Sequence, residues 1–146
     1  MSNGTLVIHI IIYPDASIRV DETHVAITVE DVRNGKYYLF HATEDTMTEE
    51  EMHFEMKEPE RNPLGTKTPH KQIVVQHAVS LSNLANLSTL MKSLPVPRPR
   101  PTRWNCQTWV KNALAEMEKR GYLAKGTGAV YYDRMMTVIT TYSAAK

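Results

Sequence analysis

Cysteine is scarce in this sequence, and its scarcity restricts both the cellular compartment and the chemistry. The 146 residues include a single cysteine, Cys106, so no disulfide can form within the chain. Proteins without disulfides are typical of reducing compartments, and we therefore expect a cytoplasmic protein. The one thiol is then a small buried hydrophobic group, a nucleophile or a metal ligand.

Long hydrophobic runs are also missing, and no apolar stretch approaches the roughly 20 residues that a membrane span needs. Residues 6–13 are apolar, but they contain His9 and lack both a basic leader and a small-residue cleavage site. They therefore predict a buried strand rather than a signal peptide. The hydrophobic content of 42% and the charged content of 23% are ordinary, and we expect one globular domain over residues 1–146.

Basic side chains are scarce in the first part of the chain, and acidic side chains are scarce in the rest. Residues 1–60 carry 4 basic and 13 acidic side chains, whereas residues 61–146 carry 13 basic and 3 acidic ones. We expect the two halves to attract each other in the fold, with opposite faces presented to a partner as the alternative. The basic residues are not interleaved with aromatic residues in a known motif, so nucleic acid is not an expected partner. The oligomeric state stays open.

The pattern of the chain predicts an α+β fold with an antiparallel sheet packed against a cysteine-bearing helix. Alternating and β-branched residues predict strands at 5–13, 23–32, 37–41 and 72–79, with a short strand inside the acidic segment 44–60. Apolar residues at helical spacing predict helices at 81–93 and from Asn105 to a stop at Gly121. Residues 131–142 fit a helix or a strand, and the proline-rich residues 94–101 predict an extended connection.

Cys106 lies where a helix is expected to begin. Asn105 is a favoured N-cap residue, which would place Cys106 in the first helical turn. Unpaired backbone N–H groups and the positive end of the helix dipole favour a thiolate there. A cysteine nucleophile also needs a base, usually an imidazole, and a polar group that orients this base.

His24 and His41 are the histidines that the predicted hairpin relates to each other. With Asn34-Gly35 as a two-residue turn, both imidazoles lie on one side of the sheet, but about 13 Å apart along the strands. A wider loop would bring them to a diagonal pair about 7 Å apart. We expect His24 as the base with His41 as its orienting residue, and Thr43 or Asp45 as alternatives.

A resemblance to known families supports this set of residues. Residues 23–30, Thr-His-Val-Ala-Ile-Thr-Val-Glu, resemble the histidine strand of circularly permuted papain-like proteins of the NlpC type. These include the lecithin:retinol acyltransferase-like and the PPPDE-type families, in which the cysteine comes late, at a helix start. The segment Asn-Cys-Gln-Thr-Trp at 105–109 is similar to their cysteine motif, and to that of small uncharacterised fungal proteins. Val25 replaces the usual aromatic residue, which disfavours a lipid acyltransferase. Gln-Thr-Trp follows the cysteine in place of the Glu-His-Phe of the acyltransferases, which leaves the substrate class open.

The resemblance implies a permuted papain-like fold and a thiol hydrolase, peptidase or acyl/amide transferase. Its catalytic residues would be Cys106, His24 and His41, acting through a thioester on a small-molecule, peptide or protein acyl substrate without a cofactor. Trp104, Gln107 and Arg103 are the expected substrate-binding residues. The alternative function is a non-catalytic protein-interaction module on the same fold. A metal site of Cys106, His24 and His41 fits by ligand type, but no tight ligand spacing supports it.

Overall fold

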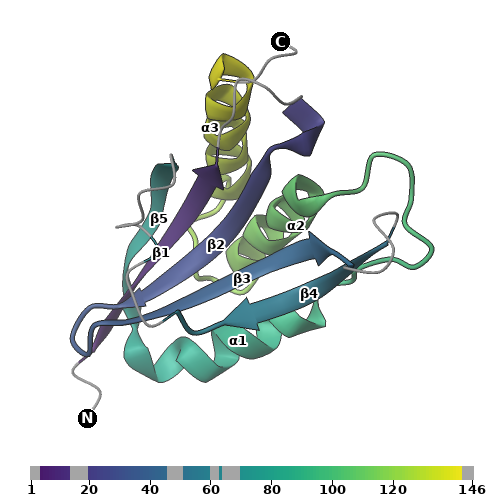
Figure 1. Ribbon diagram of the computed structural model, residues 1–146. Helices are drawn as coiled ribbons and strands as arrows, with labels where there is room; N and C mark the ends of the chain where they lie inside the picture. The colour runs from purple at the N-terminus through teal and green to yellow at the C-terminus, as the bar shows by residue number, and fades with distance from the viewer. Residues whose placement is uncertain (1–3, 14–19, 46–50, 60–62, 64–69, 143–146) are drawn as a thin grey trace.

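A computed structural model describes residues 4–13, 20–45, 51–59, 63 and 70–142, and shows an α+β fold (Figure 1). Its antiparallel sheet has five strands in the order β4-β3-β2-β1-β5. The strands are β1 (Thr5–Tyr13), β2 (His24–Asp31), β3 (Lys36–Glu44), β4 (Met52–Lys57) and β5 (Lys71–Ser80). The helices are α1 (Leu84–Ser93), α2 (Cys106–Lys119) and α3 (Thr127–Tyr142), with short 3-10 turns η1 (Val20–Glu22) and η3 (Leu81–Asn83). The coarse fold class predicted from the sequence is confirmed.

The three helices lie together on one face of the sheet (Figure 1). Alternate residues of β2 explain this layering, because Val25, Ile27 and Val29 are fully buried in the core shared with the helices. The intervening residues, from His24 to Thr28, point to the opposite face. Burying the helix-facing side chains is worth about 1.5–3 kcal/mol each, which fixes the register of β2 against slippage by one residue.

Strand β1 is an interior strand, as its apolar sequence predicts. It pairs with β2 on one side and β5 on the other, and Ile8, Ile10 and Ile12 are fully buried. His9 is also buried, and its Nε2 lies 3.3 Å from Oε1 of Glu30 on β2. The prediction that His9 is a core histidine is therefore confirmed, with Glu30 as the partner of its Nε2.

The hairpin between β2 and β3 is wider than the Asn34-Gly35 pattern predicts. The ladder closes with Asp31 opposite Lys36, so a four-residue loop replaces the two-residue turn. The Asp31 carboxylate accepts hydrogen bonds from the Asn34 backbone N–H at 3.2 Å and from its side-chain amide at 2.8 Å. Gly35 supplies the one positive φ of the loop, 64°. The two-residue turn was wrong, and the wider-loop alternative is the observed one.

Helix α2 carries the cysteine and packs into the centre of the core. Trp109, Val110 and Ala113 are fully buried, and the ring of Trp109 lies 5.8 Å from that of Phe54 on β4. The helix ends at Lys119, and the predicted stop residue Gly121 follows with a φ of 85°, which suits glycine. The Tyr122 N–H then donates to the Met117 carbonyl at 2.9 Å, which closes the last turn.

The segments on either side of α2 settle two remaining predictions. Residues 94–105 contain no helix or strand and carry the chain around one end of the sheet to α2 (Figure 1). The segment that fitted a helix or a strand is the helix α3, which packs on α2 and on β1 and β5. Met135 and Ile139, one helical turn apart, are its fully buried residues. None of the described helices is long and apolar enough to cross a membrane.

Candidate active site

Cys106 is the first residue of α2, and a capping box holds it there. The Asn105 side-chain oxygen accepts from the backbone N–H groups of Gln107 and Thr108, at 3.0 and 3.1 Å. The Thr108 hydroxyl accepts in return from the Asn105 backbone N–H at 3.1 Å. The predicted N-cap is therefore confirmed, and reciprocal bonds of this kind fix the first turn that presents the thiol.

The thiol lies against the backbone at the start of β2. Its Sγ donates to the Thr23 carbonyl at 3.5 Å, and the backbone at Val25 also hydrogen-bonds the sulfur. These two residues flank His24. The ladder between β2 and β3 ends at Ile27 opposite Phe40, so the first residues of β2 have backbone groups available to the cysteine. The late helix and the early strand thus meet at one point.

Burial dominates the acidity of this thiol. Cys106 is 7% exposed, and burial raises the pKa of its thiol above the ordinary value. Backbone hydrogen bonds and the charge of Arg100 lower that pKa, but by less. The expectation of a resting thiolate at the helix start was therefore wrong: loss of solvation outweighs the helix N-terminus, and the resting group is a thiol.

His24 and His41 form the direct pair that the wider hairpin loop allows. Paired positions of β2 and β3 sum to 67, as for Thr28 opposite Leu39, so His41 is diagonal to His24. Nε2 of His24 lies 2.9 Å from Nδ1 of His41, and the two rings meet edge to face. Tyr13 of β1 stacks on the other side of His24, with ring centroids 5.8 Å apart. His41 thus makes the contact to His24 that the predicted orienting role requires.

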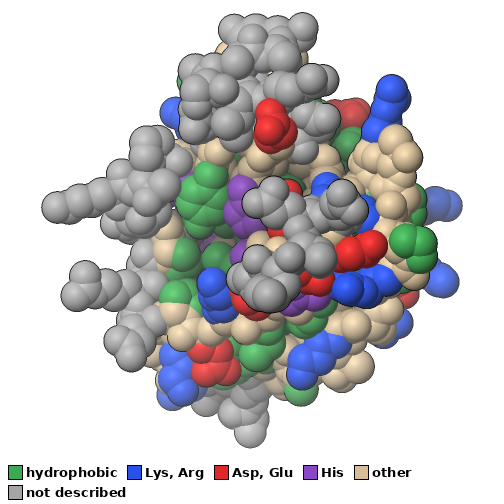
Figure 2. Space-filling model, turned by 45° about the vertical axis from the view of Figure 1, so that its right-hand side comes forward, with side chains coloured by type: hydrophobic (Ala, Val, Ile, Leu, Met, Phe, Trp, Pro, Cys, Tyr) green, Lys and Arg blue, Asp and Glu red, His purple; other side chains and the backbone are tan. Residues whose placement is uncertain are grey.

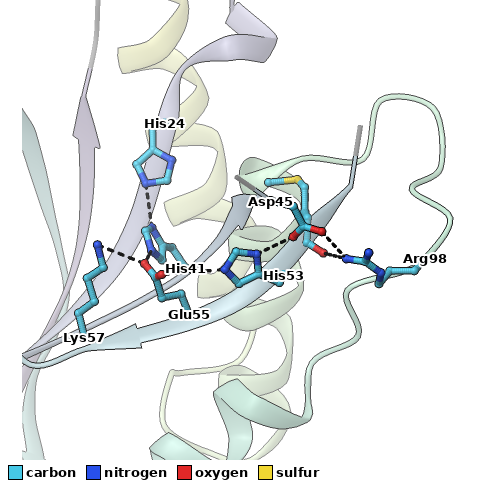
Figure 3. Close-up of polar contacts among 8 residues, drawn as sticks. His24, His41, Asp45, His53, Glu55, Lys57 and Arg98 are labelled. Carbon is cyan, nitrogen blue, oxygen red and sulfur yellow. Dashed lines mark hydrogen bonds and ion pairs between the residues drawn. The ribbon is translucent and has the colours of Figure 1, made fainter. Parts of the chain in front are cut away.

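A third side chain, Glu55, extends this pair to the edge strand. Glu55 lies opposite His41 in the β3–β4 ladder, and its Oε1 is 2.9 Å from Nε2 of His41. Figure 3 shows His24, His41 and Glu55 one after another across the three strands. Composition alone does not point to Glu55, because the acidic segment 44–60 is typical of a solvated edge. The alternation of Met52, Phe54 and Met56 is the sequence signal that could have found it. These residues share one face of the strand, so Glu55 lies on the other face, which is the face of His41.

The hydrogen bonds of this relay decide which nitrogen of His24 carries the proton. The hydrogen bond from His41 lowers the pKa of Glu55, so the carboxylate is ionised and only accepts. His41 therefore carries its proton on Nε2, and its Nδ1 is an acceptor. His24 must then donate from Nε2, which leaves its own Nδ1 unprotonated and able to accept a proton.

Both imidazoles are neutral at physiological pH. Burial, with a smaller contribution from the neighbouring His41, lowers the pKa of His24 to about 4. Burial also lowers the pKa of His41, although the hydrogen bond and charge of Glu55 oppose this. The pocket is therefore lined by a neutral imidazole and a neutral thiol.

The polar contacts continue from Glu55 to the proline-rich loop. Nδ1 of His53 donates to Oδ1 of Asp45 at 2.7 Å, and Arg98 donates to Oδ2 of Asp45 at 2.9 Å (Figure 3). The Arg98 and His53 hydrogen bonds lower the pKa of Asp45. Asp45 is thus engaged away from His24, and it is not the residue that orients it. His53, for which the sequence indicated no partner, is part of this network.

Cys106 and His24 line the same pocket, which has a volume of about 230 Å³. The other lining residues come from four segments: Glu22, Thr43, Glu44, Met52, Arg100 and Asn105. Thr43, an alternative orienting residue, therefore faces the pocket. On the surface of this side, histidine side chains emerge between a hydrophobic area and a mixture of acidic and basic side chains (Figure 2).

The three predicted substrate-binding residues are not among those that line this pocket. Gln107 is buried, and its amide donates to the carbonyls of Val20 at 2.7 Å and Thr23 at 3.0 Å. It therefore anchors the backbone just before His24. Trp104 is 9% exposed and packs in the core, while Arg103 is exposed and has a positive φ of 69°. Arg100, which sequence reasoning did not select as a site residue, faces the pocket instead.

The donor set does not resemble a metal centre. Among the residues that the structure describes, no group of three or more histidine, cysteine, aspartate or glutamate side chains is arranged to hold a metal ion. The facing nitrogens of His24 and His41 are hydrogen-bonded to each other, and the raised pKa of Cys106 keeps its sulfur a thiol.

Comparison with known proteins identifies the family of this chain. Residues 10–124 match the family described as a family of unknown function, DUF6540. The chain belongs to the DUF6540 family. The matched range includes His24, His41, Glu55 and Cys106, so the whole candidate site lies within it. No curated protein and no solved structure matches the chain.

Proposed function

We propose that this DUF6540 protein is a cysteine-dependent hydrolase or acyl/amide transferase, with Cys106 as nucleophile, His24 as base and His41 as orienting residue. The observation that supports the proposal is the shared pocket: Cys106 and His24 both line it, and His24 is hydrogen-bonded to His41, which is hydrogen-bonded in turn to Glu55. A buried structural cysteine needs neither a neutral imidazole at the same pocket nor a relay behind it.

The proposed reaction begins with two neutral partners. His24 Nδ1 takes the Sγ proton as the sulfur attacks the substrate carbonyl carbon, and the carbonyl oxygen becomes an oxyanion. The imidazolium so formed donates Nε2–H to His41, which Glu55 holds in the accepting tautomer. The tetrahedral intermediate collapses, the leaving group takes the proton from His24, and a thioester to Cys106 remains.

The second half of the reaction regenerates the thiol. Water or an amine loses a proton to His24 Nδ1 and attacks the thioester carbonyl, and the protonated His24 then returns the proton to the departing sulfur. The backbone N–H of Cys106, in the first turn of α2, has no acceptor within the helix and is the proposed oxyanion donor in both halves.

The order of elements supports a permuted papain-like arrangement, which we include in the proposal. The base lies on the early strand β2, the orienting residue on its hairpin partner β3, and the nucleophile at the start of the later helix α2. The resemblance of residues 23–30 and 105–109 to permuted papain-like motifs implies the same three roles.

Acyl transfer to the thiol provides a direct test. Exposure of the protein to p-nitrophenyl acetate should release p-nitrophenol and add one acetyl group, located on Cys106 by mass spectrometry. Cys106→Ala should abolish the adduct, and His24→Ala should slow its formation by about 10²–10⁴-fold. Equal acetylation rates with and without His24 would contradict the proposal.

The second candidate function is a non-catalytic protein-interaction module, and the raised pKa of the buried Cys106 thiol is the observation that favours it. In that case the thiol is a packing group, and the wild type should show no faster acetylation than His24→Ala. The same experiment therefore separates the two functions.

A further inference from the structure

Arg100 is the basic side chain among those that line the pocket of Cys106 and His24. The loop between α1 and α2 delivers it there from a position six residues before the cysteine. In the proposed function this pocket must accommodate two negative charges in turn, on the sulfur and then on the carbonyl oxygen. Burial opposes both, because it removes the water that would otherwise solvate them.

The structure fixes the position of this arginine at two points. Its Nε donates to the Trp104 carbonyl at 2.6 Å, and its backbone N–H donates to the Glu51 carboxylate at 3.4 Å. Trp104 is itself held by packing in the core and by a backbone hydrogen bond to Pro101 at 3.1 Å. A guanidinium anchored in this way keeps its charge at the pocket without a large cost in side-chain entropy.

The charges facing the thiol come from several elements. Glu22 of η1 and Glu44 of β3 line the same pocket and oppose a developing negative charge, and His24 of β2 is neutral. The positive charge of Arg100 has the contrary effect to these carboxylates, and it lowers the pKa of Cys106. An arginine does not titrate in the accessible pH range, so this contribution is constant while the histidines change state.

We propose that Arg100 supplies the positive charge that stabilises the Cys106 thiolate and the tetrahedral oxyanion, a role that rests on the proposed function. Its anchor on Trp104 holds the guanidinium at the pocket that Cys106 also lines. Arg100 is therefore an electrostatic residue of the site, and the thiolate is formed less readily without it.

The test is the pH dependence of Cys106 alkylation by iodoacetamide, a neutral reagent. Arg100→Gln removes the charge and should raise the apparent pKa of the thiol by about 0.5–1 unit. At a fixed pH below that pKa, the alkylation rate should then fall about 3–10-fold. Arg100→Lys keeps the charge and should restore most of the rate, although it also loses the arginine contact to Trp104.

Arg103→Gln is the matched control, because Arg103 is an exposed arginine on the same loop that does not line the pocket. It should leave the titration unchanged. Since Arg100→Gln and Arg100→Lys share the loss of the Trp104 contact, equal shifts in these two variants would overturn the proposal, as would a shift of the same size in Arg103→Gln. Unfolding temperatures confirm that the compared variants are folded.

These outcomes are distinct from failure of the proposed function. If His24→Ala still slows acetylation but Arg100→Gln leaves the thiol titration unchanged, the nucleophile and base stand and the role of Arg100 fails. If acetylation is independent of His24, the proposed function fails whatever Arg100 does to the titration.

Discussion

At the scale of single residues, the candidate site combines a neutral thiol with a neutral imidazole. Burial raises the pKa of the Cys106 thiol and lowers the pKa of His24 to about 4, so neither group is charged at pH 7. A preformed thiolate–imidazolium pair would need the opposite shifts, a lowered pKa of the thiol and a raised pKa of the imidazole. In the proposed mechanism the proton therefore moves as the sulfur attacks, which makes the tautomer of His24 decisive, as in a serine hydrolase triad.

Glu55 is the residue on which that tautomer depends. Glu55→Ala removes the acceptor of the His41 Nε2–H, so His41 no longer has to accept from His24 through Nδ1. We expect acetylation of Cys106 to slow by about 10–100-fold, less than the roughly 10⁴-fold effect of a wrong tautomer in direct contact with the base. Burst kinetics with p-nitrophenyl acetate measure this.

Glu55→Gln and Glu58→Ala provide the controls. The glutamine retains a carbonyl oxygen as acceptor and should keep much of the rate, whereas Glu58 is exposed beyond the end of β4 and its loss should have no effect. An unchanged rate in Glu55→Ala would show that His41 keeps its tautomer without the carboxylate.

Residue types and order were enough to select Cys106, His24 and His41, but not Glu55 or Arg100. Local reasoning finds a nucleophile at a helix start because capping depends on adjacent residues such as Asn105. Glu55 reaches His41 only through the β3–β4 register, which a sequence with eight acidic residues in one segment does not specify. The same holds for Arg100, whose role depends on the path of a loop without periodicity.

At the scale of elements, the N-terminus of α2 has both a structural role and a place in the candidate site. The capping box of Asn105 and Thr108 stabilises the helix and also fixes the position of Cys106. Gln107, next in the chain, ties this turn to the backbone before His24. The first turn of α2 is thus bonded both internally and to the start of β2.

Asn105→Ala should destabilise the protein by about 1 kcal/mol, a typical cost for loss of an N-cap side chain. Asn83→Ala is the matched control, because Asn83 precedes α1 without a side-chain capping bond. Urea unfolding should show a clear loss of unfolding free energy for the first variant and little for the second. Equal losses would contradict the role given to the capping box.

The hairpin shows why sequence predicts elements better than their register. Asn34-Gly35 favours a two-residue turn locally, but Asp31 captures Asn34 and the loop takes two more residues. The two loops differ by a shift that preserves the face of every side chain, so alternation cannot distinguish them. Only the wider loop brings His41 to His24, and the site therefore depended on the feature that the sequence left open.

At the scale of the whole molecule, the acidic and basic halves of the chain meet near the site. Arg98 binds Asp45 and the Met52 carbonyl, and the Arg100 backbone N–H binds Glu51. These contacts join the proline-rich loop to the acidic ends of β3 and β4. The expected attraction between halves is realised there, and it carries Arg100 to the pocket.

The neutral histidines should make the protein sensitive to acid. His24 has a folded pKa of about 4 and an ordinary value of 6.5, so the unfolded chain binds more protons between these values. The contribution of neutral His24 to the free energy of unfolding is therefore fully present above about pH 6.5, and it is lost as the pH falls toward 4. With allowance for partial exposure, we expect His24 to account for a loss of about 1–2 kcal/mol.

Urea unfolding at pH 7, 5.5 and 4.5 measures this loss. His24→Gln should flatten the dependence of the unfolding free energy on pH, whereas His53→Gln, a more exposed histidine on the same face of the sheet, should leave most of it. A steep acid loss that persists unchanged in His24→Gln would assign the sensitivity to other groups.

The central claim, that neutral His24 is the base for Cys106, is tested most directly by the pH–rate profile of Cys106 acetylation in wild type and His24→Ala. For the wild type we predict a rate that rises as the pH passes about 4, where His24 loses its proton, and then stays level to about pH 8. The variant should react more slowly and climb about tenfold per pH unit over the same range, because only the thiolate fraction then reacts. Two superimposable profiles would contradict the claim.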